Sequence, residues 1–259
     1  MPRFDPHPER RPALVTGASS GFGAGIARGL AAAGHPVVLA ARRLDRLEAL
    51  ATEIVADGGE AAAVALDLFD DASIDAAAAA AAEPFGPLDV LVSNAGSISS
   101  QPALAEDPAA FVRSFQLNLL GVQRLLAHLG PAMVERGHGD VVIVSSDVTV
   151  NPRPSMAGYV SSKAALEALA RVLRMELEGT GVRVGLVRPG PGSTEQGTDW
   201  DEETVLRIVP QWERWGLLRH DGALRPQDLA PAVLAMISAP KGTHLTLIDV
   251  QPEAPVRPD

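Results

Sequence analysis

The chain of 259 residues contains no cysteine. This absence excludes disulfide bonds, thiolate metal sites and cysteine nucleophiles, and it agrees with a reducing compartment. Lysine and tyrosine are scarce, because Lys163 and Lys241 are the only lysines and Tyr159 is the one tyrosine. The positions of such rare residues carry more information than those of abundant ones.

Long apolar runs are missing as well. No segment has eighteen consecutive apolar residues free of charge, and residues 1–11 are polar. We therefore expect a cytoplasmic protein without a membrane partner. The net charge of −10 and the pI near 5.1 argue against nucleic acid as a partner, because phosphates would be repelled. The six histidines show no close ligand spacing, so no metal site is expected.

The rare tyrosine stands four residues before one of the two lysines. On a helix this spacing puts Tyr159 and Lys163 on the same face. A neighbouring ammonium lowers the pKa of a phenol, which makes it a usable proton donor and acceptor near neutral pH. The alternative is a buried tyrosine and a surface lysine at this spacing by chance.

Short runs of Val, Leu and Ile alternate with longer segments of helical periodicity, such as 46–54 and 119–129. Strands buried on both faces and separated by helices predict a parallel, doubly wound α/β sheet. The alanine-rich run 76–82 also favours a helix. The expected strands are 13–16, 36–41, 61–66, 88–92, 140–144, 182–187 and 244–250.

No linker, repeat or charge block divides the sequence. We therefore expect one domain over 1–259, with proline-rich extended segments at both ends. These are an N-terminal arm at 1–11 and a C-terminal tail at 251–259, and such segments are more often flexible or packed on a neighbour than catalytic.

The first expected strand runs directly into a glycine-rich turn at 16–23, with glycines at 17, 21 and 23. Strand, glycine turn and helix together predict a site for a pyrophosphate group. The same residues also spell GxSxG around Ser19, the nucleophile elbow of α/β serine hydrolases. Only eighteen residues precede Ser19, and the partners His244 and Asp249 would come in the wrong order, so a hydrolase is the remote alternative.

With these motifs the chain resembles the short-chain dehydrogenase/reductase family, in its compact single-domain NAD(P)-dependent branch. Residues 16–23 resemble the family's TGxxxGxG turn, and Asn94, Ala95 and Gly96 resemble its NAG motif. Ser146 lies thirteen residues before Tyr159, as the catalytic serine does in the family. The resemblance runs from residue 13 to about 250 and implies a Rossmann-like sheet of about seven parallel strands with helices on both faces.

The resemblance implies roles for four residues. Tyr159 would transfer the proton, Ser146 would polarise the substrate carbonyl, and Lys163 would lower the pKa of Tyr159 and hold the nicotinamide ribose. Asn118 would anchor a chain of water molecules to that lysine. Ser145 is the next candidate for the serine role, and local hydrogen bonding is the structural alternative for Ser146 and Asn118.

The implied cofactor site includes Tyr159 and Lys163. Its further members are Gly17, Ser19, Ser20, Gly21, Phe22, Gly23, Arg42, Arg43, Asp67, Leu68, Asn94, Ala95, Gly96, Pro189, Gly190, Gly192 and Thr194. Two positions depart from the family pattern. Ser93 replaces an asparagine, and Gly192 stands where valine or isoleucine is usual, which predicts a looser loop.

The end of the second expected strand indicates which cofactor is preferred. NAD-binding turns place a carboxylate there for the ribose hydroxyls. This chain has Arg42 and Arg43 instead, and no acid before Asp45, so we expect NADP to be favoured over NAD. The alternative is that both arginines are solvated and Asp45 serves the ribose.

The three tryptophans all lie within 194–218, the segment that covers the substrate in the family. Trp200 and Trp212, with Arg153 and Met156 on the loop before Tyr159, are the expected substrate pocket. Their aromatic surface favours an apolar or bulky substrate, although packing in the core or between subunits is the alternative.

We therefore expect an NADP-dependent oxidoreductase that transfers a hydride between nicotinamide and a carbonyl or secondary alcohol. A regulator that binds NADP without turnover is the second reading, and a hydrolase acting through Ser19 is the third. Apolar faces on the helices at 118–134 and 159–177 predict a homodimer or homotetramer.

Overall fold

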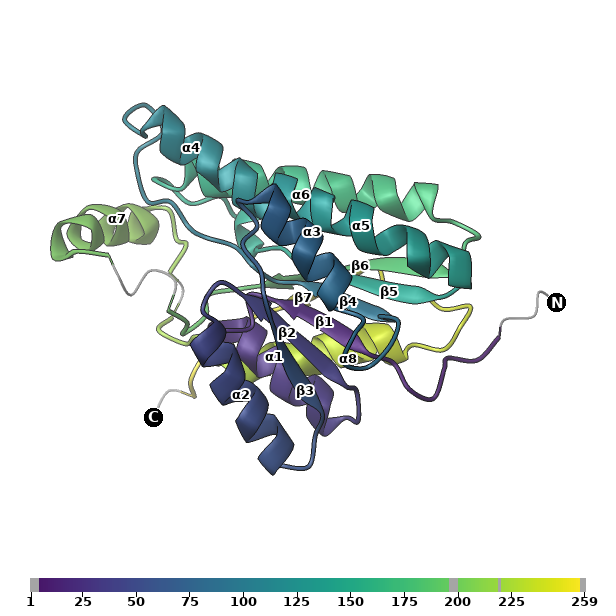
Figure 1. The fold of residues 1–259 in the computed structure, drawn as a ribbon. Helices are drawn as coiled ribbons and strands as arrows, with labels where there is room; N and C mark the ends of the chain where they lie inside the picture. The colour runs from purple at the N-terminus through teal and green to yellow at the C-terminus, as the bar shows by residue number, and fades with distance from the viewer. Residues whose placement is uncertain (1–4, 196–199, 219, 257–259) are drawn as a thin grey trace.

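The computed structural model describes residues 5–195, 200–218 and 220–256. Within these residues seven parallel strands form one sheet in the order β3-β2-β1-β4-β5-β6-β7 (Figure 1). Their bounds are β1 Ala13–Thr16, β2 Val37–Ala41, β3 Ala61–Ala65, β4 Val90–Ser93, β5 Gly139–Val144, β6 Val182–Pro189 and β7 Leu247–Val250. The predicted doubly wound sheet is confirmed, and each strand overlaps its expected range.

Helices cover both faces of the sheet (Figure 1). On one face lie α1 Gly21–Ala32, α2 Leu44–Ala56 and α8 Ala230–Ser238. On the other lie α3 Asp71–Ala80, α5 Gly121–Arg136 and α6 Ala157–Glu176. Two more helices, α4 Pro108–Phe115 and α7 Glu202–Arg214, lie at one end of the sheet. Short helical turns η1 Gln116–Leu120, η2 Asp147–Thr149 and η3 Pro226–Leu229 connect these elements.

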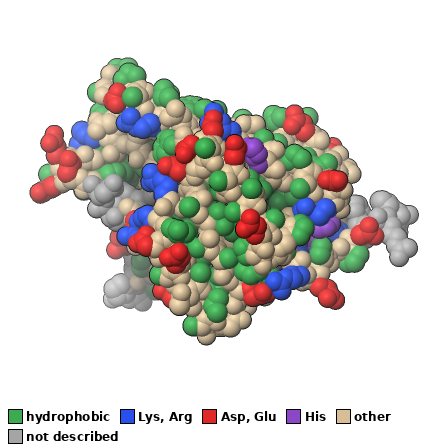
Figure 2. All heavy atoms as spheres, in the orientation of Figure 1, with side chains coloured by type: hydrophobic (Ala, Val, Ile, Leu, Met, Phe, Trp, Pro, Cys, Tyr) green, Lys and Arg blue, Asp and Glu red, His purple; other side chains and the backbone are tan. Residues whose placement is uncertain are grey.

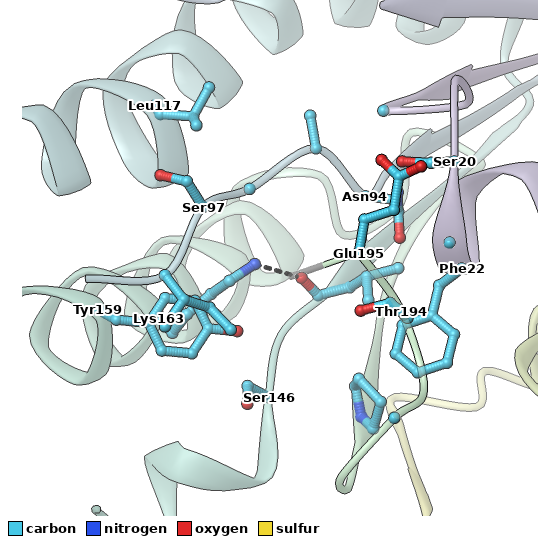
Figure 3. Close-up of a pocket in the computed structure, with 18 of the residues that line it drawn as sticks. Ser20, Phe22, Asn94, Ser97, Leu117, Ser146, Tyr159, Lys163, Thr194 and Glu195 are labelled. Atoms are coloured by element: carbon cyan, nitrogen blue, oxygen red, sulfur yellow. Dashed lines mark hydrogen bonds between the residues drawn. The ribbon is translucent and has the colours of Figure 1, made fainter. Parts of the chain in front are cut away.

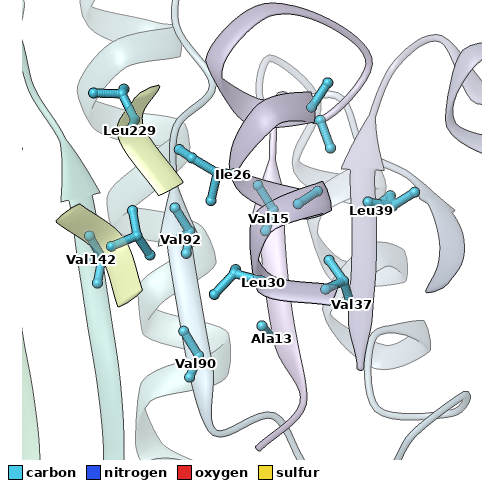
Figure 4. Close-up of a cluster of buried hydrophobic side chains, with 14 of the residues drawn as sticks. Ala13, Val15, Ile26, Leu30, Val37, Leu39, Val90, Val92, Val142 and Leu229 are labelled. Atoms are coloured by element: carbon cyan, nitrogen blue, oxygen red, sulfur yellow. The ribbon is translucent and has the colours of Figure 1, made fainter. Parts of the chain in front are cut away.

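Successive residues of each central strand enter opposite cores, which is why these strands are apolar throughout rather than alternating. Val15 and Leu39 pack toward α1, where Ile26 and Leu30 meet them (Figure 4). Leu14 packs on the other face, under α3, α5 and α6. Burial of each such side chain contributes about 1.5 to 3 kcal/mol, so the two cores together hold the strands in one sheet.

The strand order reverses between β1 and β4. These neighbours pair in register, with Val15 opposite Val92. In parallel sheets a ligand crevice opens outside the carboxyl ends of the strands at this reversal. The glycine turn after β1 and the segment Asn94 to Gly96 after β4 therefore meet at the same edge.

At the opposite edge of the sheet a buried cluster of charges joins the amino ends of four strands. Arg11, just before β1, binds the carboxylates of Asp89 and Asp140 and donates to the Ile237 carbonyl at 2.6 Å. Arg183 binds Asp140 at 2.7 Å. The described part of the predicted N-terminal arm, residues 5–11, thus ends in Arg11, whose side chain is 6% exposed and packs within its own chain.

Acidic, basic and hydrophobic side chains are interspersed on the face of the molecule in Figure 2. Charged side chains of one sign therefore do not form a single patch on this face. None of the helices in the described ranges has the length and apolarity that crossing a membrane requires.

The charge cluster predicts different consequences for two adjacent arginines. Arg11→Met should lower the free energy of unfolding by about 3 kcal/mol, because buried carboxylates lose their cation. Arg10→Met is the matched control, since the Arg10 and Glu60 side chains are 53% and 48% exposed and such a pair contributes about 1 kcal/mol at most. Urea denaturation measures both, and equal losses in the two variants would contradict the prediction.

Candidate active site

The glycine turn is held against the end of β4 by hydrogen bonds. The Thr16 hydroxyl accepts from the backbone N–H groups of Asn94 and Ala95, both at 3.0 Å. In return, the Asn94 side-chain amide donates to the Thr16 carbonyl at 3.0 Å. The ends of the two central strands are thereby joined at the mouth of the crevice.

Close packing requires glycine at two positions of this turn. Gly17 has φ of +68°, and a Cβ atom on Gly23 would lie 2.3 Å from the Gly17 carbonyl oxygen. The tight turn leaves the amino end of α1 facing the crevice, and the first turn of α1 contains no acidic residue. Free backbone N–H groups at a helix amino end bind anions, so this turn fits a pyrophosphate group.

A cavity of about 690 Å³ opens at the carboxyl ends of the strands. It brings together most of the predicted site residues from distant parts of the sequence. The expected members that line it are Gly17, Ser19, Ser20, Gly21, Phe22, Arg42, Arg43, Asp67, Leu68, Asn94, Ala95, Gly96, Ser146, Arg153, Met156, Tyr159, Lys163, Pro189, Gly190, Gly192, Thr194, Trp200 and Trp212. Gly23 and Asn118 are not among the described residues that line the cavity; Gly23 packs against Gly17, and Asn118 is fully buried.

Tyr159 and Lys163 project from the first turns of α6 into this cavity, with Ser146 from the end of β5 opposite them (Figure 3). The three residues are 6%, 3% and 7% exposed. The Ser146 hydroxyl hydrogen-bonds to the Tyr159 phenol. The sequence motifs predict that these three residues belong to one site, and the structure brings them together.

The net lowering of the phenol pKa that was expected beside the lysine is not found in this structure. Burial raises the pKa of Tyr159, an effect that the Ser146 hydrogen bond opposes. The Lys163 ammonium instead donates to the Val144 carbonyl at 2.9 Å and lies 6.0 Å from the centre of the tyrosine ring. Burial also lowers the pKa of Lys163 to about 8, while the charge of Glu167 opposes this shift.

Asn118 lies in the π-helical turn η1 between α4 and α5. Its side chain accepts from the Ser97 N–H at 3.0 Å and donates to the Ser97 carbonyl at 3.1 Å. It also donates to the Ser162 hydroxyl on α6 at 3.0 Å. Asn118 therefore ties the segment after β4 to α6, and the alternative of purely local bonding is wrong.

Glu167 separates the roles of the two adjacent serines. This buried carboxylate, one turn after Lys163 on α6, accepts from the Ser145 hydroxyl at 2.7 Å and from Thr149 at 2.8 Å. Arg188 of β6 pairs with it at 3.0 Å. Ser145 is thus turned toward Glu167, while Ser146 contacts the phenol. Sequence reasoning missed Glu167, although its spacing of four from Lys163 was a usable signal.

The other end of the cavity carries arginines. Arg43 donates to the hydroxyls of Ser19 and Ser20 at 3.0 and 2.8 Å, and to Glu195 at 2.9 Å. Arg46, one turn further along α2, donates to Glu195 at 2.6 Å. Arg46 and Glu195 were not predicted, and the spacing of Arg46 from Arg43 was the available signal. Asp45 is not among the described residues that line the cavity.

The predicted substrate residues form one wall of the cavity. Trp200 and Trp212 meet edge to face, with ring centres 6.1 Å apart. Behind them the buried Arg153 guanidinium pairs with Asp147 at 2.7 Å and lies 5.7 Å from the Trp212 ring centre. Asp147 was missed. Trp215 is 71% exposed and does not line this cavity.

The substrate-covering segment predicted at 194–218 includes residues 196–199, which fall outside the described residues. The looser loop expected at Gly192 stays a prediction, and the structure adds a packing reason for glycine there. A Cβ atom there would lie 2.2 Å from the Phe22 ring, so glycine allows Phe22 to pack against the backbone. The loop is also paired, because Ser193 donates to the Leu224 carbonyl and Leu224 to the Pro191 carbonyl, both at 2.8 Å.

The three residues of a serine-hydrolase active site do not come together around Ser19. Its hydroxyl accepts from Arg43, while His244 hydrogen-bonds to the Val184 carbonyl at 3.0 Å and Asp249 pairs with Arg188 at 3.0 Å. Across the described ranges, no group of three or more His, Asp or Glu side chains could hold a metal ion.

Comparison with known proteins identifies the family. Residues 11–204 match the short chain dehydrogenase family. The chain is 32% identical over 246 residues to 2,3-dihydro-2,3-dihydroxybenzoate dehydrogenase of Bacillus subtilis, covering 92% of this chain and 93% of that protein. It is also 34% identical over 241 residues to glycine betaine reductase ATRR of Emericella nidulans, covering 93% of this chain but 18% of that longer protein.

Two solved structures are similar over nearly their whole length. An alcohol dehydrogenase from Thermococcus sibiricus complexed with 5-hydroxy-NADP superposes with a TM-score of 0.81 at 31% identity, covering 97% of this chain and 100% of that one. A 3-ketoacyl-(acyl-carrier-protein) reductase from Brucella melitensis complexed with NADH gives a TM-score of 0.79 at 33% identity, covering 93% and 96%. The chain therefore belongs to the short-chain dehydrogenase/reductase family, oxidoreductases that use a nicotinamide cofactor and act on alcohol or carbonyl groups.

Proposed function

We propose that the protein is an NADP-dependent oxidoreductase that interconverts a carbonyl compound and a secondary alcohol. The observation that carries this proposal is the buried contact between the Tyr159 phenol and the Ser146 hydroxyl on the cavity wall, one helical turn from the Lys163 ammonium. A nicotinamide bound in the same cavity would supply or accept the hydride.

The four polar residues would divide the proton chemistry among them. Ser146 donates a hydrogen bond to the carbonyl oxygen of the substrate and so polarises it. Tyr159 is protonated at neutral pH, because burial raises its pKa, and it gives its proton to that same oxygen as the carbonyl is reduced. Lys163 would stabilise the phenolate that remains and would hold the nicotinamide ribose when the cofactor is bound, and water molecules near Asn118 would return a proton.

The arginines at the end of β2 support a preference for NADP over NAD. Arg42 and Arg43 line the cavity where an NAD site would have a carboxylate, and Arg46 in the first turn of α2 shares the carboxylate of Glu195 with Arg43. The similar proteins from Thermococcus and Brucella are described with an NADP derivative and with NADH, so the preference depends on residues particular to this chain. We expect NADPH to bind more tightly than NADH in a fluorescence titration, and the reverse order would contradict the assignment.

An apolar or bulky carbonyl compound is the proposed substrate. Val148, Met156 and Trp212 pack around Tyr159, which supports an apolar pocket beside the reacting group. The buried ion pair between Arg153 and Asp147 adds charged groups to one part of this pocket.

We propose further that the protein is cytoplasmic and a homodimer or homotetramer. Exposed apolar side chains on the outer faces of α5 and α6 support association, among them Val134, Val172 and Met175. Light scattering that finds only monomer would contradict this.

The test of the catalytic proposal measures NADPH oxidation with hydrophobic ketones and, in the reverse direction, NADP reduction with small polar hydroxy acids. Tyr159→Phe should lower kcat by about 10² to 10⁴, because the proton donor is lost, while NADPH still binds. Ser161→Ala, an exposed position on the same helix, is the control and should retain activity. A wild-type protein that binds NADPH but turns over no substrate would favour the regulator, and better turnover of polar hydroxy acids would contradict the apolar pocket.

The pH dependence should report Lys163. Because its pKa is lowered to about 8, its ammonium is lost as the pH rises through 8, and kcat/KM for reduction should fall above that pH. Glu167→Gln should move this alkaline limb to lower pH, since the carboxylate raises the Lys163 pKa. Glu176→Gln, exposed at the end of the same helix, is the control. An alkaline limb that Glu167→Gln leaves in place would refute the assignment to Lys163.

A further inference from the structure

One carboxylate binds two arginines at the end of the cavity next to the glycine turn, here called the ribose end: Arg43, which lines the cavity, and Arg46, which lies beside it. The two oxygens of Glu195 are shared, with Arg43 donating to one at 2.9 Å and Arg46 to the other at 2.6 Å. Arg43 immediately precedes α2 and Arg46 lies in its first turn, whereas Glu195 follows β6 about 150 residues later. The contact therefore exists only in the folded protein.

This ionic bridge lies against the glycine turn. The same Arg43 guanidinium that binds Glu195 also donates to the hydroxyls of Ser19 and Ser20. Ser19, Ser20, Arg43 and Glu195 all line the cavity. Figure 3 shows the Glu195 carboxylate directed toward Ser20. The bridge thus lies at the end of β2, where the adenosine ribose of the proposed cofactor would be bound.

The chemistry of Glu195 matches that of a phosphate monoester. Carboxylate and phosphate oxygens both accept charge-assisted hydrogen bonds from guanidinium groups, so the two anions use the same donors. Glu195 also keeps its charge, because hydrogen bonds from Arg43 and Arg46 lower its pKa to about 2. At neutral pH the site therefore already contains a full negative charge.

We propose that Glu195 is a specificity-determining residue that competes with the 2′-phosphate of NADP for Arg43 and Arg46. It thereby narrows the preference for NADP over NAD that the arginines alone would create. This inference rests on the proposed NADP site.

The exposure of the bridge indicates that Glu195 adjusts binding rather than preventing it. The side chains of Arg43, Arg46 and Glu195 are 40%, 46% and 52% exposed, so solvent screens their attraction. A phosphate monoester brings a charge of about −1.5 to −2 and three acceptor oxygens, against one charge and two oxygens for Glu195. The phosphate can therefore displace the carboxylate at a modest loss of affinity.

The experiment compares 2′,5′-ADP with 5′-AMP as probes, using calorimetry on the full chain. Glu195→Gln should bind 2′,5′-ADP about fivefold more tightly than wild type, the factor that corresponds to about 1 kcal/mol for an exposed ion pair. Its affinity for 5′-AMP should stay unchanged. Glu53→Gln is the matched control, because Glu53 is another exposed glutamate paired with an arginine, Arg28, outside the cavity.

A second variant tests whether the effect acts through the arginine. In an Arg43→Met background the gain from Glu195→Gln should shrink, since one of the two contested donors is gone. An equal gain for both probes would overturn the proposal, because the effect would then not depend on the 2′-phosphate. Weaker binding of 2′,5′-ADP by Glu195→Gln would also overturn it and would show that Glu195 positions the arginines instead.

The two proposals can fail separately. Wild-type protein that binds 5′-AMP more tightly than 2′,5′-ADP would contradict the NADP preference. If Glu195→Gln still shifts the ratio of the two affinities toward 2′,5′-ADP, the proposed role of Glu195 stands. If this ratio is the same in the variant as in the wild type, the role of Glu195 is overturned, whichever probe the wild type prefers.

Discussion

The hydrogen bonds between Thr16 and the backbone after β4 are the constraint on which the candidate site depends. They join the carboxyl ends of the two central strands at the point where the strand order reverses. The glycine turn can then pack on Asn94, and the amino end of α1 faces the crevice. Together with the pairing of β1 and β4, this junction places the glycine turn and the wall that carries Tyr159 in one cavity.

A second set of hydrogen bonds and ion pairs orients the wall of the cavity that carries Ser146, Tyr159 and Lys163. Asn118 links the segment after β4 to α6, and Glu167 links α6 to the end of β5 and to β6. Because Asn118, Ser162, Ser145, Glu167 and Arg188 are buried, leaving any of their polar groups unsatisfied would be costly, and the network favours one arrangement of Ser146, Tyr159 and Lys163. The same burial acts on the ionisable groups, since it raises the pKa of the phenol and lowers that of the ammonium.

The two ends of the cavity use charge differently. Around Tyr159 the charges are buried and paired, as with Asp147 and Arg153, so each contributes to the local field with little screening. At the ribose end Arg43, Arg46 and Glu195 are half-exposed, and their interactions are correspondingly weaker and exchangeable. The end around Tyr159 therefore holds the less screened charge pairs, and the end around Arg43 is the one at which we propose that anions compete.

Local patterns in the sequence determined the seven strands, the glycine turn and the placement of Tyr159 and Lys163 on one helix, because side-chain periodicity and helical spacing act over a few residues. Only the tertiary structure decided which serine faces the phenol, that Gly192 makes room for Phe22, and that Glu195 reaches Arg43 and Arg46. It also reversed the expected shift of the phenol pKa. These outcomes depend on burial and on contacts between residues far apart in the chain, which no short stretch of sequence encodes.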